Sequence, residues 1–192
     1  MPNVTIPEEH ADDPIGYAIQ NIRPELTGPL YDLSKAVYQK SKLPLRIFEA
    51  VRARIALING CQLCQQFRSI SDVPTYLAGL GEDPAVGVHT HGPGPEEQFY
   101  LDIADWRDSP IYSERERIAI EYAERFSQSP DALGYDADFW ERAKAQFSED
   151  ELYDMTIAVA CFVATGRFVH VLGFDGTVAC EVRDGQPQMA AE

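Results

Sequence analysis

The sequence predicts an all-α fold, and three observations support this prediction. Apolar residues recur at helical spacing in several long segments, and no segment shows the strict alternation of a half-buried strand. Two Ser-x-x-Glu motifs, beginning at Ser113 and Ser148, have the pattern of a capping box before an apolar helical run. Helix stops lie at Pro44 and at Asn59-Gly60.

Residues 1–28 are expected to form an extended acidic arm, because prolines at positions 2, 7, 14 and 24 disfavour regular structure. The arm is either a solvated tail or a segment that lies on a neighbouring subunit. We expect residues 29–180 to form a single all-helical domain and residues 181–192 to form a tail. A chain of 192 residues with 45% hydrophobic content is large enough for one core.

Helical spacing and capping motifs place the helices within this domain. The predicted helices are 29–42, about 45–58, a helix that starts at Cys61 and continues through CQLCQQFRSI, 113–127, 136–147 and 148–171. Residues 79–95 are rich in Gly and Pro and are expected to form a loop. The final helix carries apolar residues around much of its circumference, so it is buried centrally or shared between subunits, and we expect a homo-oligomer.

Charge and composition narrow the classes of function. The net charge of −15, from 31 acidic and 16 basic residues, repels phosphate backbones, so we expect no nucleic-acid partner. The N-terminal segment lacks the pattern of a signal peptide, and no stretch approaches the ~18 uninterrupted apolar residues of a membrane span. We therefore expect a soluble cytoplasmic protein without a membrane partner, in which close cysteines are catalytic or metal-binding rather than a static disulfide framework.

The Cys61-Gln-Leu-Cys64 motif is the candidate for chemistry. Two thiols at a helix start can form a reversible disulfide, and the partial positive charge of the helix N-terminus favours the thiolate. A zinc site is the alternative, but only His89 and His91 could complete its ligand set, and they lie in the Gly/Pro-rich loop. We expect no metal and no cofactor. Cys161, on an apolar helix, is expected to be a small buried hydrophobe.

Together with Glu49, twelve residues before Cys61, the motif in EAVRARIALINGCQLC resembles the carboxymuconolactone decarboxylase and alkylhydroperoxidase D-like family. The segments SERERIAIEYAERF and FSEDELYDMTIAVACFVATGRFVHVLGF look like later helices of that family, so the resemblance covers most of residues 30–174. It implies an all-helical, homo-oligomeric protein that reduces a hydroperoxide. In the implied scheme Cys64 attacks the peroxide, Cys61 resolves the sulfenic acid as a disulfide, and an external dithiol reduces the pair.

The resemblance implies that Glu49 takes part in relaying a proton from the cysteine. From the residues alone, an exposed helical ion pair of Glu49 with Arg46 or Arg52 is the favoured interpretation, and the resemblance reverses that order. The family has a histidine four residues after the second cysteine, where this chain has Arg68. Arginine cannot act as a base, but one helical turn beyond Cys64 it could stabilise a thiolate. The alternative for Arg68 is a surface cation paired with one of the many acidic residues.

These observations support three hypotheses for function. The first is a thiol-dependent peroxidase or disulfide oxidoreductase that uses Cys64, Cys61, Glu49 and Arg68. The second is a family scaffold that has lost turnover and keeps a redox-sensing or structural role. The third is a reaction of the lactone decarboxylase type, which would need acidic and basic groups around an organic-acid pocket rather than a dithiol.

Overall fold

The structure, a computed structural model, describes residues 2–176, and all regular elements in this range are helical. The tail expected at 181–192, and Cys180, lie outside the described residues. The α-helices are α1 Pro14–Asn21, α2 Pro24–Lys40, α3 Leu45–Ile58, α4 Gln62–Gln66, α5 Ser69–Gly79, α6 Glu97–Leu101, α7 Glu114–Gln128, α8 Pro130–Gly134, α9 Ala137–Gln146 and α10 Glu149–Val171. Single 3₁₀ turns occur at Glu8–His10 (η1) and Val88–Thr90 (η2). The all-α prediction is confirmed.

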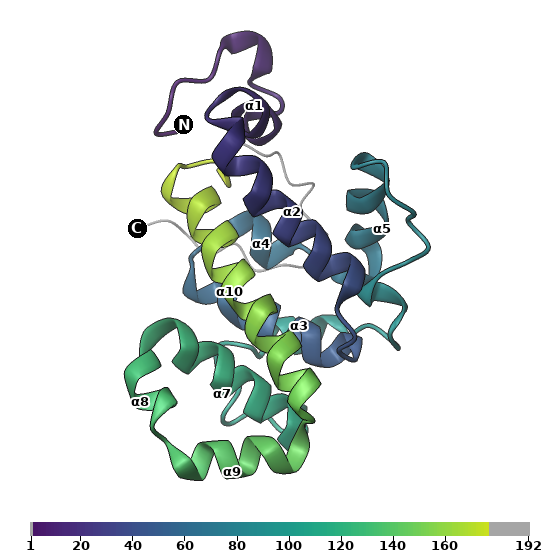
Figure 1. Cartoon of the computed structure of the whole chain (residues 1–192), viewed down its shortest axis with the longest axis vertical. Helices are drawn as coiled ribbons and strands as arrows, with labels where there is room; N and C mark the ends of the chain where they lie inside the picture. Colours follow the sequence, from purple (N-terminus) through teal and green to yellow (C-terminus); the bar gives the residue numbers. More distant parts are fainter. Residues whose placement is uncertain (1, 177–192) are drawn as a thin grey trace.

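Helix α3 lies at the centre of the fold, packed between α7 and α10. Figure 1 shows α10 running alongside α2 from the end of the molecule formed by α7, α8 and α9 to the end that carries α1. Most residues of α3 are buried, including the charged pair Glu49 and Arg52. Because α3 ends next to α4, the central helix fixes the position of the cysteine motif.

The helices with clear sequence signals form where they are expected. The segment predicted at 45–58 is α3, and the predictions near 113–127, 136–147 and 148–171 match α7, α9 and α10 to within about one residue. Both capping boxes are present: the side chain of Ser113 accepts from the Glu116 amide, and that of Ser148 accepts from the Glu151 amide. Each satisfies backbone donors that the first turn leaves without a partner.

The prediction of an extended arm over residues 1–28 is wrong from residue 14 onward. Pro14 and Pro24 occupy the first position of α1 and α2, where a missing N–H is harmless and the fixed φ suits a helix. Asp13 caps α1 by accepting the amide of Gly16 at 2.9 Å. Helix α2 therefore begins five residues before the predicted start, and Pro29 lies inside it.

The single helix expected from Cys61 onward is also wrong, because the chain breaks after Gln66. Phe67 and Arg68 have extended backbone, and a new helix, α5, starts at Ser69. Asp72 in the first turn of α5 accepts the amide of Arg68 at 2.7 Å. The break means that Arg68 does not share a helix face with Cys64.

Helix α10 is long and apolar enough to cross a membrane by length and composition, with a mean hydropathy of 1.4 over its most apolar window. Of that window, 44% is buried inside the protein. The buried residues, which include Met155, Val159 and Phe162, pack against α3 and α2. The buried helix at the core of a helical bundle can have the same length and apolar composition, and the contacts with α3 and α2 identify α10 as such a helix.

Candidate functional site

Cys61 and Cys64 form a disulfide at the start of α4, with their Cα atoms 5.3 Å apart. Cys61 is the residue that caps the helix, and its sulfur accepts the backbone N–H of Cys64 at 3.2 Å. The predicted proximity of the two thiols at a helix start is confirmed. Gly60 makes the turn between α3 and α4 with φ of +68°, a conformation that favours glycine.

The two cysteines differ in burial. Cys61 is fully buried in a small apolar cluster with Ala18, Val169 and Phe174. Cys64 is partly exposed and lines a pocket. An external molecule that enters this pocket therefore meets Cys64 and not Cys61.

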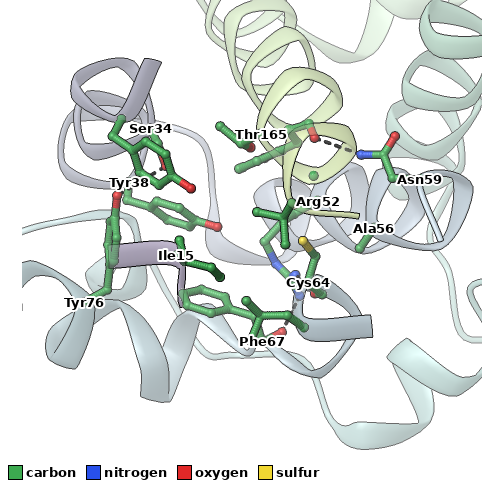
Figure 2. Close-up of a pocket in the computed structure, with 15 residues that line it drawn as sticks. Ile15, Ser34, Tyr38, Arg52, Ala56, Asn59, Cys64, Phe67, Tyr76 and Thr165 are labelled. Carbon is green, nitrogen blue, oxygen red and sulfur yellow. Dashed lines mark hydrogen bonds between the residues drawn. The ribbon is translucent and has the colours of Figure 1, made fainter. Parts of the chain in front are cut away.

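The pocket has a volume of about 240 Å³ and lies between α1, α2, α3, α4, α5 and α10 (Figure 2). Its walls are mainly aromatic and aliphatic, with few polar groups. The lining residues are Ile15, Tyr31, Ser34, Tyr38, Arg52, Ala56, Asn59, Leu63, Cys64, Phe67, Tyr76, Phe162, Thr165, Gly166 and Val169. Burial raises the pKa of Tyr31 and Tyr38, so both present neutral phenols. The cavity suits an organic molecule with a small polar group.

Gly166 and Asn59 allow α10 to approach the end of α3 closely. A Cβ atom at Gly166 would lie 2.4 Å from Nδ2 of Asn59, so a larger side chain would push the helices apart. Asn59 Nδ2 donates to the Phe162 carbonyl at 2.9 Å, and its Oδ1 accepts from Arg167 at 3.1 Å. This contact brings the last turns of α10 next to the cysteine motif.

Arg52 is the cation that holds the cysteine motif. It is 3% exposed, and its Nη1 donates to the Cys64 carbonyl at 2.6 Å while its Nη2 donates to the Phe67 carbonyl at 2.6 Å. Figure 2 shows the guanidinium beside Cys64 at the pocket wall. The sequence places Arg52 only on a helix side away from the apolar stripe, and its burial is not apparent from periodicity.

Glu49 is completely buried and is the counterion of Arg52. Its Oε1 accepts from Arg52 Nε at 2.7 Å and also from the Ser69 hydroxyl, and its Oε2 accepts from Arg52 Nη2 at 2.8 Å. Burial by itself would raise the pKa of Glu49, but the Arg52 charge and these hydrogen bonds hold it below the usual value. The expected ion pair with Arg52 is present, but it is buried rather than exposed.

The hydrogen-bond partners of the Arg68 guanidinium do not include either cysteine. Its guanidinium forms a bidentate pair with Glu97, at 2.6 and 3.1 Å, and donates to the carbonyls of Gln65 and Phe67 at 2.6 and 3.0 Å. It also stacks 3.8 Å from the ring centre of Tyr100. The expectation that Arg68 lies on the face of Cys64 is therefore wrong, because the chain leaves the helix at Phe67. Arg68 is an ion-paired cation, as the alternative proposed, but it is buried.

The remaining candidates do not join the cysteine pair. Within residues 2–176, no three His, Cys, Asp or Glu side chains are grouped so that they could hold a metal, so His89 and His91 do not complete a ligand set with Cys61 and Cys64. Nδ1 of His91 lies 3.3 Å from the Leu43 carbonyl. Cys161 is buried, and burial raises the pKa of its thiol to about 11. This supports its interpretation as a small core residue.

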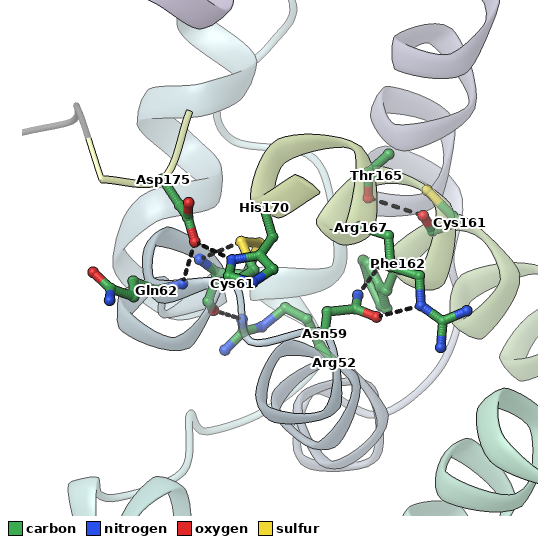
Figure 3. The surroundings of a disulfide bond; sticks show 11 residues. Arg52, Asn59, Cys61, Gln62, Cys161, Phe162, Thr165, Arg167, His170 and Asp175 are labelled. Atoms are coloured by element: carbon green, nitrogen blue, oxygen red, sulfur yellow. Dashed lines mark hydrogen bonds and ion pairs between the residues drawn. A yellow bond between two sulfur atoms is a disulfide. The ribbon is translucent and has the colours of Figure 1, made fainter. Parts of the chain in front are cut away.

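Sequence reasoning missed one more pair near the disulfide. His170, in the last turn of α10, and Asp175, just after it, lie beside Cys61 and Gln62 in Figure 3. His170 shows no sequence signal other than its residue type at the end of a helix. Its proximity depends on the Gly166–Asn59 approach of α10 to α3.

The fold and the site define a class: an all-helical protein with a dithiol pair at the wall of an apolar pocket. No family model matches the sequence. The chain is 32% identical to the uncharacterized protein YnjA of Escherichia coli (strain K12) over 144 residues, which span 75% of this chain and 68% of YnjA. The chain belongs to the carboxymuconolactone decarboxylase and AhpD-like family, as the resemblance in its sequence implied.

A solved structure shares this fold. It is that of a protein of unknown function from Agrobacterium tumefaciens, described as a candidate antioxidant defence protein AhpD. The two align with a TM-score of 0.57 and 23% sequence identity, over 83% of this chain and 94% of the other. At this identity the likeness concerns the fold, and it places the helix bundle among AhpD-like structures.

Proposed function

We propose that the protein is a thiol-dependent peroxidase that reduces organic hydroperoxides through Cys64 and Cys61. The observation that carries the proposal is the unequal burial of the pair. Cys64 lines the apolar pocket, whereas Cys61 is sealed in the cluster behind it. A peroxide in the pocket contacts the sulfur of Cys64, and the sulfur of Cys61 is close enough to form a disulfide with it.

The chemistry balances over three steps. The Cys64 thiolate attacks a peroxide oxygen, the O–O bond breaks, and the alkoxide takes up a proton to leave as an alcohol while Cys64 becomes a sulfenic acid. Cys61 then displaces hydroxide from that sulfur, which gives the disulfide and water. An external dithiol reduces the disulfide and is itself oxidised, so it supplies the two electrons that the peroxide consumes.

In this proposal Arg52 takes the electrostatic role that the sequence suggested for Arg68. Its guanidinium is fixed at the motif by two carbonyls and by Glu49, and it stays protonated at physiological pH. A fixed buried cation beside the pocket favours the thiolate of Cys64 over the thiol. Glu49 has both oxygens engaged by Arg52 and Ser69, so it contributes by holding Arg52 in position.

The pocket favours an organic substrate over hydrogen peroxide. Aromatic rings of Tyr31, Tyr38, Phe67, Tyr76 and Phe162 form much of its wall. Removing an apolar substituent from water into such a pocket is worth about 0.8 kcal/mol per CH₂ group. A bulky alkyl or aryl hydroperoxide gains this contribution, and hydrogen peroxide does not.

The test is single-turnover reduction of cumene hydroperoxide and of hydrogen peroxide by the reduced protein, followed by multiple turnover with dithiothreitol. We expect a higher second-order rate constant for cumene hydroperoxide. Cys64→Ser should abolish consumption, and Cys61→Ser should consume one equivalent and leave a sulfenic acid that dimedone traps. Cys161→Ala is the matched control and should behave as wild type.

Two results would contradict the proposal. Peroxide consumption that survives Cys64→Ser would remove Cys64 from the chemistry. A reduced wild-type protein that forms neither sulfenic acid nor disulfide with either peroxide would favour the alternative of a family scaffold without turnover. Retained activity on a lactone substrate after loss of both cysteines would favour the decarboxylase type.

A further inference from the structure

His170 and Asp175 form a hydrogen-bonded pair where the last turn of α10 meets the start of α4. Nδ1 of His170 lies 2.9 Å from Oδ2 of Asp175. The same carboxylate oxygen accepts the backbone N–H of Gln62 at 3.0 Å. Asp175 is 8% exposed, while the His170 side chain is 46% exposed, so the imidazole bridges the buried corner and solvent. The peroxidase scheme above assigns no role to either residue.

The pair contacts the residues on both sides of Cys61. On one side, a Cβ atom at Gly60 would lie 3.1 Å from Nε2 of His170, so the imidazole rests on the Gly60 backbone. On the other side, Asp175 binds the amide of Gln62. Figure 3 shows the imidazole next to Cys61 in this corner. The ring is therefore held next to the buried cysteine, and His170 is not among the residues that line the pocket.

The hydrogen bond to Asp175 also selects the form of the imidazole. A carboxylate only accepts, so Nδ1 carries the proton and donates it to Asp175. In the neutral ring Nε2 then has the free lone pair, on the side that faces Gly60. A histidine oriented in this way can take a proton at Nε2 and return it, while the carboxylate stabilises the imidazolium.

We infer that His170 transfers the proton of Cys61, with Asp175 as its positioning residue. This inference rests on the proposed dithiol chemistry. When Cys61 attacks the sulfenic acid of Cys64, its thiol proton passes to Nε2, the S–S bond forms, and the proton goes to the hydroxide that leaves, which gives water. When a dithiol attacks Cys64 of the disulfide, the attacking thiol loses its proton, which reaches Nε2 of His170 through solvent; the S–S bond then breaks, and the imidazolium gives this proton to the departing Cys61 thiolate.

The charged groups around the imidazole leave this task to His170. Arg167, one turn earlier on α10, points its guanidinium to Asn59 and to the Ser127 carbonyl. On α3, Arg52 lies across the motif at the Cys64 carbonyl and stays protonated. Glu49 is bound to Arg52. Of these groups and Asp175, His170 alone carries an imidazole, which can accept a proton at one ring nitrogen while the other donates a hydrogen bond.

The experiment measures the two directions of the disulfide step separately. In one arm the reduced protein receives one equivalent of cumene hydroperoxide, and sulfenic acid and disulfide are quantified by quenching and mass spectrometry. In the other arm dithiothreitol reduces the disulfide, so that no peroxide is needed. Both arms run from pH 5.5 to 8.5 on wild type, His170→Gln and Asp175→Asn, with His10→Gln as the control for loss of a histidine elsewhere.

His170→Gln should slow both disulfide formation and disulfide reduction by about 10²-fold, the usual lower value for a general acid–base group. Asp175→Asn should slow them less. The ratio of wild-type to His170→Gln rate should change with pH in both arms, whereas formation of the sulfenic acid should stay within about twofold, because it takes place at Cys64. His10→Gln should match wild type throughout.

The outcomes separate this inference from the proposed function. If wild type makes no sulfenic acid, the peroxidase proposal fails, and the dithiothreitol arm still decides the role of His170. Disulfide reduction and formation in His170→Gln at wild-type rates, with an unchanged pH profile, would overturn the inference. A uniform loss in every step at every pH would also overturn it, since that pattern belongs to a structural role.

Discussion

Replacing Arg52 with Met tests whether the buried ion pair fixes the cysteine motif. Glu49 is 0% exposed and Arg52 is 3% exposed, so the substitution leaves a carboxylate in the core without its counterion. Breaking a buried pair in this way typically lowers the free energy of unfolding by about 3–5 kcal/mol. The carbonyl of Cys64 loses its donor as well, at about 1–3 kcal/mol if it stays buried, while the carbonyl of Phe67 keeps Arg68 as a donor. We expect a loss of about 4 kcal/mol, because the two costs overlap when the α4 turn relaxes toward water.

The assay is urea unfolding followed by circular dichroism, with all proteins kept oxidised. Arg52→Met and Glu49→Gln should each be strongly destabilised, and the double variant should be more stable than the sum of the two losses predicts, by about 2 kcal/mol or more. Arg54→Met is the matched control on the same helix, since Arg54 pairs with the partly exposed Glu124. A loss below about 1 kcal/mol in Arg52→Met would refute the reasoning.

The loss of stability in Arg52→Met should depend on pH, in a direction that follows from the pKa of Glu49. In wild type the pKa of Glu49 is held below its unfolded value, so its contribution is fully present above that value and is lost as pH falls through the folded pKa. Without Arg52, burial dominates and raises the pKa of Glu49. The folded variant then binds more protons than the unfolded chain, and its stability falls as pH rises. The difference between wild type and Arg52→Met should therefore be larger at pH 7 than at pH 4, and a difference that is flat with pH would contradict this argument.

Three further predictions concern the surroundings of the motif. Gly60→Ala should lose about 1–2 kcal/mol of stability in urea unfolding, because φ is +68° and the new Cβ meets His170, and His170→Ala should restore only the part due to contact. In the reduced protein at pH 8, iodoacetamide should label Cys64 first and leave Cys161 unlabelled until the chain unfolds, since burial raises the pKa of Cys161 to about 11. Sedimentation at micromolar concentration should give a mass above the 21.5 kDa of one chain, as expected from the apolar circumference of α10; a monomer would count against this.

The long amphipathic helices could be predicted from the sequence because their signals are local. In α7 and α10 a capping box and a helical apolar pattern lie in one continuous segment, and both ends were placed to within about one residue. The N-terminal helices could not be predicted, because the effect of proline on a helix depends on its position in that helix. Pro14 and Pro24 end regular structure when they lie inside a helix and favour it when they lie at the first position, and only the surrounding packing decides between these.

The site was predictable as far as its chemistry follows from spacing along the chain. The Cys61–Cys64 pair at a helix start is local, and the structure confirms it. The role of Arg68 was not predictable, since it depends on whether one helix continues through Phe67. It does not continue: Arg52 binds the Phe67 carbonyl from another helix, and Asp72 in the first turn of α5 accepts the backbone N–H of Arg68. A tertiary contact overrides the local helical preference.

The absence of a histidine at position 68 has a different meaning once the fold is known. From the sequence it removes the titratable group one turn after Cys64, and this weakens the case for peroxidase chemistry. In the fold, the end of α10 brings His170 to the other cysteine, and Asp175 orients it. In the cycle that we propose, two tasks fall to different residues. A fixed cation, Arg52, is bound to the carbonyl of the cysteine that meets the peroxide, and a proton-transfer group, His170, lies beside the resolving cysteine. On this proposal, exchange of one residue in a family motif does not decide the activity, because a side chain more than a hundred residues away in the sequence handles the proton of the resolving cysteine. If His170→Gln leaves the disulfide step unchanged, this division of roles is wrong, and His170 does not replace the histidine that the family has at position 68.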